Sequence, residues 1–92
     1  MCIMYAIMTV TGADHTGIIA AVTTSLAEAD VNILDVSQTL MADFFTMILR
    51  IEFDENSLNI QDLQSRLDDV AEQQRLEIRV QSEALFTAVN EI

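Results

Sequence analysis

The stretch of residues 44–53 constrains the fold of this chain more than any other. Apolar side chains occupy every second position along it, namely Phe45, Met47, Leu49, Ile51 and Phe53. The positions between them are mixed, with Thr46, Arg50 and Glu52 beside the apolar exceptions Phe44 and Ile48. Because alternate side chains of a strand point to opposite faces, this pattern is typical of an antiparallel sheet that is covered on one face only.

Three other stretches predict strands. Residues 3–11 are apolar or β-branched and contain no breaker. Within residues 31–40, one face carries Leu34, Val36, Gln38 and Leu40, and the other carries Asp35, Ser37 and Thr39. Residues 76–81 alternate between apolar and polar side chains. Residues 41–43 separate two of these strands and predict a hairpin turn.

Apolar residues at helical spacing predict the helices. The first helix has the stripe Ile18, Val22, Leu26 and Ala29 and stops near Asp30. The second has the stripe Ile60, Leu63, Leu67, Val70 and Ala71, ends near Arg75, and can take its cap from the loop 54–57. A short third helix is predicted over residues 82–92, with Ser82 as its cap and an apolar side formed by Ala84, Leu85, Ala88, Val89 and Ile92.

The order of these elements predicts the fold class. Each strand–helix–strand unit crosses over in the right-handed sense, which places both main helices on the same face of the sheet. We therefore expect an α+β protein with a ferredoxin-like βαββαβ sandwich: a four-stranded antiparallel sheet, two helices on one face, and an extra C-terminal helix at about 82–92. Residues 1–92 are expected to form a single domain.

The charge balance restricts the partners. Fifteen acidic residues against four arginines give a net charge of −11, which repels phosphate backbones and argues against nucleic-acid binding. The acids are scattered along the chain and predict a solvated acidic surface, with adaptation to a high-salt habitat as an open alternative. The chain is 51% hydrophobic, which is high for its size and predicts that some apolar surface lies in a partner interface.

The cysteine count and the first residues bear on the compartment. The single cysteine, Cys2, excludes a disulfide framework and a CxxC motif. Residues 1–10 lack a basic region and a cleavage site, and they are too few to span a bilayer. We therefore expect a cytoplasmic protein without a membrane partner.

Residues 12–17, between the first strand and the first helix, have the composition of a binding loop. They hold both glycines and the only histidine of the chain. Gly12 and Gly17 permit positive φ or the close approach of a ligand. Gly17 begins a helix whose first N–H groups are unpaired and suit a carboxylate, and Asp14 suits an ammonium group. The alternative is that Asp14 or Thr16 simply caps the helix.

The same loop lacks the residues that enzymes of this fold class need. It contains no cysteine pair for copper and no arginine for phosphate. Asp14 and His15 are adjacent in sequence, and adjacent side chains rarely form a base and its orienting partner. We therefore expect a protein that is not an enzyme and has no cofactor and no metal. Metal ligation by His15 with Asp14 and Asp35 is the alternative.

Two motifs resemble those of a known family. Residues 9–19 resemble the G-x-D-x-x-G-[IV]-[IV] opening of ACT domains, and residues 31–33 resemble their G-x-N-I entry into the second strand. Residues 32–39 and 44–47 are similar to the small stand-alone ACT proteins of the UPF0237 group, which also carry a C-terminal helix. One position departs from the pattern: Asp30 stands where many family members have glycine.

The resemblance implies a regulatory module that binds a small molecule, commonly an amino acid, at an interface between two domains. Carried over by position, with His15 added from the same loop, the ligand-binding candidates are Gly12, Asp14, His15, Gly17, Ile18, Asn32 and Ile33. For Asn32 the alternative is a turn residue that closes the helix.

A chain with a single ACT-like unit can complete such a site only by self-association. We therefore expect a homodimer, formed either through an edge strand and the first helix or through the open sheet face with Phe44 and Ile48. A regulated protein partner would be supplied in trans. The alternative function is a protein-interaction adaptor, a dimer that docks on an enzyme or transcription regulator without a small ligand.

Overall fold

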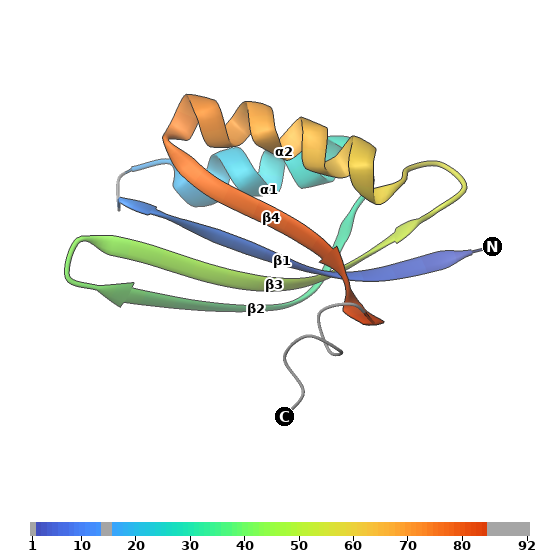
Figure 1. Ribbon diagram of the computed structural model, residues 1–92, viewed down its shortest axis with the longest axis horizontal. Helices are drawn as coiled ribbons and strands as arrows, with labels where there is room; N and C mark the ends of the chain where they lie inside the picture. The colour runs from blue at the N-terminus through green and yellow to red at the C-terminus, as the bar shows by residue number, and fades with distance from the viewer. Residues whose placement is uncertain (1, 14–15, 85–92) are drawn as a thin grey trace.

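The computed structural model describes residues 2–13 and 16–84. Its elements are β1 (Ile3–Ala13), α1 (Ile18–Glu28), β2 (Asn32–Met41), β3 (Phe44–Asp54), α2 (Ile60–Gln74) and β4 (Leu76–Ser82). The strands form one four-stranded sheet in the order β2-β3-β1-β4 with every pairing antiparallel. Both helices lie on the same face of this sheet (Figure 1). The predicted ferredoxin-like sandwich is therefore confirmed.

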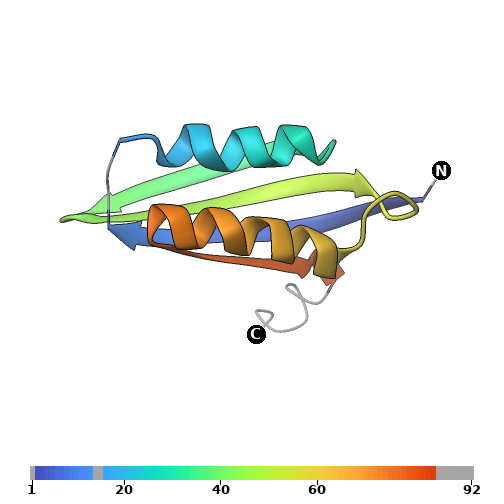
Figure 2. The same ribbon diagram turned by 90° about the horizontal axis from the view of Figure 1, so that it is seen from above.

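The core lies between the sheet and the two helices. All five alternating apolar side chains of residues 44–53 are buried, as the pattern predicted. From the helix layer, Ile18, Val22 and Leu26 of α1 and Leu63 and Leu67 of α2 close the core. Figure 2 shows α1 on the β2 side of the sheet and α2 on the β4 side. The apolar residues predicted from the strand period and from the helix period therefore lie in the same core.

Edge strand β2 has an apolar face that the helices do not cover. Val36 and Leu40 pair with Leu49 and Phe45, which are buried, so their side chains lie on the helix side of the sheet. Nevertheless Val36 is 52% exposed and Leu40 59%. A bulge between Ile33 and Asp35 removes Leu34 from the regular alternation. We call Ile19, Val36 and Leu40 together the β2 rim; Ile19 comes from α1 and is also exposed.

Two predicted boundaries were wrong. Strand β1 continues to Ala13, so Gly12 lies within a strand and not in a loop. The N-cap of α2 is Asn59, beyond the loop 54–57, and its side chain accepts a 2.7 Å hydrogen bond from the Asp62 N–H. Ser82 is the last residue of β4, and the two residues after it, Glu83 and Ala84, are helical, so the predicted cap at Ser82 stays a prediction. The predicted third helix otherwise falls mostly on residues 85–92, which lie outside the described residues.

Asp30 has a left-handed backbone conformation, with φ of 58°. Glycine adopts this conformation without a steric penalty, whereas aspartate adopts it at a cost. The carboxylate also lies just beyond the C-terminal end of α1, where a negative charge opposes the helix dipole.

Replacing Asp30 by glycine is therefore expected to stabilise the protein by about 1 kcal/mol in urea unfolding. The control is Asp30→Ala, which removes the charge and keeps the backbone strain, so it should recover only a small part of this gain. An equal gain from both variants would show that the charge, and not the backbone conformation, carries the cost.

Candidate ligand-binding site

Gly17 is the residue of the predicted loop whose backbone most needs glycine. It is the N-cap of α1 with φ of +94°, and an added Cβ would meet no atom within 4 Å among the described residues. Glycine is therefore required there by conformation, and the space beside it is open to a ligand. The first turn of α1 contains no acidic residue, so the positive end of the helix dipole stays available for an anionic group. Asp14 and His15 lie outside the described residues.

Gly12 serves a different purpose from the predicted one. A Cβ at this position would lie 2.7 Å from Leu76 Cδ2 and 3.1 Å from the Arg75 carbonyl oxygen. The close approach that Gly12 permits is therefore to the start of β4, within the same chain. Gly12 pairs with Phe45 on one side and Leu76 on the other, and so it joins three strands of the sheet.

Asn32 and Ile33 lie at the other end of the sheet. Asn32 pairs with Glu52, whereas Gly12 pairs with Phe45, so the two candidate positions are about 23 Å apart along β3 at about 3.3 Å per residue. The Asn32 side chain donates a 2.9 Å hydrogen bond from Nδ2 to Glu52 Oε1. One chain therefore brings Gly12, Gly17 and Ile18 together, but it does not bring Asn32 and Ile33 to them.

Two candidates have little exposed surface. Ile18 as a whole residue is only 2% exposed, and Ile33 is partly buried against the core. Ile18 therefore offers a ligand almost no surface in a single chain. Gly17 has no side chain, so at the loop end of the candidate site it can offer a ligand only its backbone groups. Any side-chain contact at this end would come from Asp14 and His15.

A hollow that the sequence did not predict lies beside this end of the sheet. It has a volume of about 330 Å³ and is lined by Ile19, Gln38, Thr39, Leu40 and Phe45. That volume is at the low end of the range for small-molecule sites. It opens at the β2 rim, and Leu40 pairs with Phe45 in the same register as Gly12. The apolar Leu40 was the one sequence feature that could have indicated this hollow. The alternation of side chains along the strand does not show that Leu40 is exposed.

The two edges of the sheet differ in whether they can accept another strand. On the β4 edge, Gln64 of α2 donates from Nε2 to the Ile78 carbonyl oxygen and accepts from the Val80 N–H, both at 2.8 Å. A primary amide offers the same donor and acceptor as a peptide group, so Gln64 takes the place of a neighbouring strand. On the β2 edge, the Val36 N–H is bound by the Asp35 side chain at 3.0 Å. The outer side of β2 has no strand neighbour in the described part of the chain.

The open face of the sheet, away from the helices, carries an ion pair that is stacked against an aromatic ring. Arg50 Nε donates to Glu83 Oε1 at 2.6 Å, and the guanidinium lies 5.2 Å from the centre of the Tyr5 ring. The hydrogen bond with Arg50 lowers the pKa of Glu83, and the same bond raises the pKa of Arg50. This pair was missed from the sequence because its members are far apart in the chain.

Other kinds of site are not seen among the described residues. Within residues 2–13 and 16–84, no group of three or more His, Cys, Asp or Glu side chains could hold a metal ion. In the same part of the chain, neither helix is both long and apolar enough to cross a membrane. The predicted alternative of a metal bound by His15, Asp14 and Asp35 involves two residues outside this part.

The comparisons with known proteins agree with the fold. The family model of the ACT domain matches residues 4–81. A UPF0237 protein of Corynebacterium efficiens is 64% identical over 97% of this chain and 100% of its own length. The chain therefore belongs to the ACT domain family, and within it to the UPF0237 group.

Two solved structures show how widely this architecture occurs. An ACT domain protein from Streptococcus pneumoniae has a TM-score of 0.81 at 36% identity, with 90% of this chain and 93% of that chain covered. The regulatory subunit of aspartate kinase from Thermus thermophilus has a TM-score of 0.68 at 21% identity, with 85% of this chain and 51% of that chain covered. The second likeness concerns the fold alone.

Proposed function

We propose that this protein is a non-enzymatic regulatory module that binds an amino acid between two copies of the chain. One observation carries the proposal: the candidate residues lie at opposite ends of the sheet, about 23 Å apart along β3. If two copies pair their β2 edges antiparallel about a twofold axis, the loop end of one copy meets the Asn32 end of its partner. A dimer thus contains two complete sites, whereas a single chain contains none.

The edges of the sheet favour this arrangement. Gln64 occupies the β4 edge, so extension of the sheet is left to β2, where the Asp35 side chain would have to release the Val36 N–H. The β2 rim is apolar and exposed on the helix side, and pairing of two β2 edges would bury it. Among proteins of this fold, the Thermus thermophilus structure is by its name a regulatory subunit, which is the class of function we propose here.

The chemistry of the site suits an amino acid. The N-terminus of α1 at Gly17 would receive the carboxylate, and Asp14 the ammonium group. The Asn32 amide of the partner copy would add a hydrogen bond after release from Glu52. The hollow at Ile19 and Leu40 would take the ligand side chain, which favours an apolar amino acid.

A thermal-shift series with the common amino acids tests the proposal. A ligand at 100 times its dissociation constant stabilises by about 2.7 kcal/mol, so we expect one amino acid to raise Tm by about 10–20 °C. Asp14→Ala and Asn32→Ala should each abolish the shift. Asn56→Ala, the same change in an exposed loop residue, should preserve it.

The alternative function, an adaptor without a small ligand, makes the opposite prediction for this series. The exposed β2 rim is the observation that favours it, because an apolar surface of this kind can also receive another protein. If no amino acid changes Tm, an amino-acid ligand is excluded and the adaptor becomes the better explanation. A shift that survives both Asp14→Ala and Asn32→Ala would place the ligand elsewhere on the protein.

A further inference from the structure

The open face of the sheet carries apolar side chains that no helix covers in the described part of the chain. Tyr5 is 42% exposed and Ile48 43%, and Ile7 between them is half-buried. Tyr5 and Ile7 of β1 pair with Glu52 and Arg50 of β3. Tyr5, Ile7 and Ile48 therefore surround Arg50. We call Tyr5, Ile7 and Ile48 the open-face patch. Such a patch in a highly acidic protein requires a covering partner or a reason to stay exposed.

The chain turns onto this face as it leaves β4. In Figure 1 the end of β4 lies on the side of the sheet away from the helices. Glu83, directly after β4, reaches Arg50 through two hydrogen bonds, at 2.6 Å from Nε and 3.4 Å from Nη2. Because Arg50 belongs to β3, the contact crosses β1. The ion pair therefore holds the last described residues above the open-face patch.

The residues that follow have the composition of a covering segment. Within residues 85–92, Leu85, Ala88, Val89 and Ile92 fall at helical spacing, and Thr87, Asn90 and Glu91 occupy the opposite positions. Phe86 falls between these two sides. A helix over this range would be about 12 Å long, and strands lie about 4.8 Å apart. Its length therefore matches the span from β4 across β1 to β3, where the patch lies.

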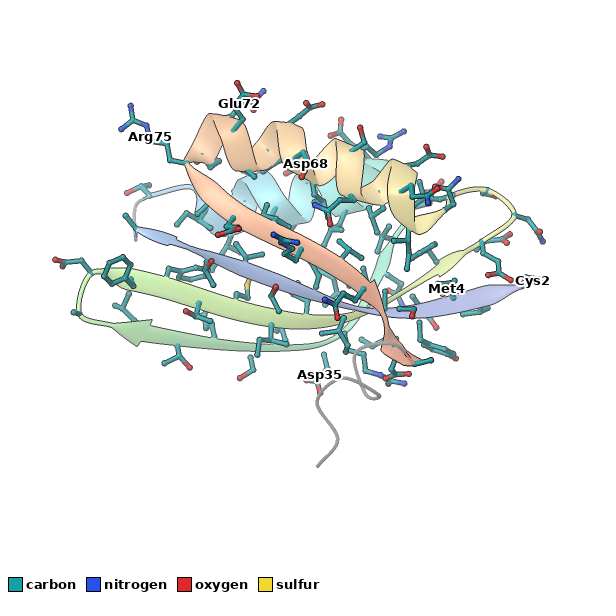
Figure 3. All side chains as sticks on the ribbon, viewed as in Figure 1. Cys2, Met4, Asp35, Asp68, Glu72 and Arg75 are labelled. Atoms are coloured by element: carbon teal, nitrogen blue, oxygen red, sulfur yellow. The ribbon has the colours of Figure 1, made fainter. Side chains whose placement is uncertain are left out.

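We propose that residues 85–92 dock on the open-face patch of their own chain, with the Arg50–Glu83 pair as the anchor. A tethered segment has a high effective concentration at this surface, which a second copy lacks. A second copy facing this surface would also meet a surplus of like charge, since acidic side chains outnumber the two arginines, Arg50 and Arg79, on the open face; Figure 3 shows one of the acids, Asp35, there. Docking of residues 85–92 on the open face leaves the β2 rim as the surface for self-association. The docking proposal does not depend on ligand binding.

Fluorescence quenching tests the docking, because Tyr5 is the only tyrosine and the chain has no tryptophan. Val89→Asp places a charge on the apolar side of the segment and should increase quenching of Tyr5 by acrylamide at least about twofold, since a packed segment shields the ring. The matched control Asn90→Asp adds the same charge to the polar side and should leave quenching unchanged. Glu83→Gln weakens the anchor and should give an intermediate increase.

Two outcomes would overturn the proposal. One is equal quenching of Tyr5 in the wild-type chain, in Val89→Asp and in Glu83→Gln. The other is protection of Tyr5 that disappears when the wild-type chain is diluted, because this would show that a second copy covers the face. Circular dichroism of each variant verifies that the sheet and the helices are intact, so that an increase in quenching reports release of the segment and not unfolding.

Discussion

Replacing Val36 by aspartate is expected to separate the proposed dimer into single chains. Val36 is 52% exposed in one chain, so the charge costs the isolated chain little. In the paired β2 edges it would be buried without a counter-ion, close to its copy across the twofold axis. Burial of an unpaired charge costs about 3 kcal/mol or more, which raises the dissociation constant at least about 100-fold.

Sedimentation velocity over a series of concentrations measures this change. The matched control is Ile48→Asp, which adds the same charge at a similarly exposed position on the open face and should leave the dimer intact. If Ile48→Asp dissociates the protein and Val36→Asp does not, the dimer forms through the open face. A wild-type protein that sediments as a single chain at micromolar concentrations would contradict any dimer.

Replacing Gly12 by valine is expected to lower the free energy of unfolding by about 2–3 kcal/mol. Any Cβ at this position meets Leu76 Cδ2 at 2.7 Å, and this side-chain end can rotate away. Two backbone atoms cannot rotate away: the Arg75 carbonyl oxygen at 3.1 Å and the Leu76 Cα at 3.3 Å. The start of β4 would therefore have to move away from β1, and the branched side chain of valine needs more space than a single methyl group.

Urea unfolding followed by circular dichroism measures this loss. Gly12→Ala should cost about 1 kcal/mol, because only one carbon atom has to be accommodated. Thr11→Val is the control: Thr11 is exposed, is adjacent in the same strand, and should tolerate the change. If Gly12→Val unfolds like the wild type but loses the thermal shift by an amino acid, Gly12 serves the ligand and not the sheet.

The core was predicted from the sequence because the positions of its residues follow from local geometry. A strand repeats every two residues and a helix about every 3.6, so spacing alone assigns Leu49 or Leu63 to a buried face. The same reasoning identified the face of Val36 and Leu40 correctly. Their exposure could not be predicted, because it depends on how far α1 extends over an edge strand.

The contacts that join distant parts of the chain were not predicted. Gly12 was interpreted as a loop residue, but its small size is needed by Arg75 and Leu76. Gln64 lies on a helix that looks ordinary in sequence, yet its amide completes the hydrogen bonds of β4. These contacts depend on which surfaces meet after folding, and periodicity contains no information about that.

The sequence by itself determined the class of this protein. Its periodicities specify two helices and four strands in one order, and right-handed crossovers leave one sandwich for that order. The motifs in residues 9–19 and 31–33 then place the chain in the ACT family, as the family match over residues 4–81 shows. Only the tertiary structure decided how the two motifs are related in space. Strands β1 and β2 both run antiparallel to β3 and are therefore parallel to each other. Helix α1 must then return the chain from Gly17, after the end of β1, to Asn32, at the start of β2 and the opposite end of the sheet.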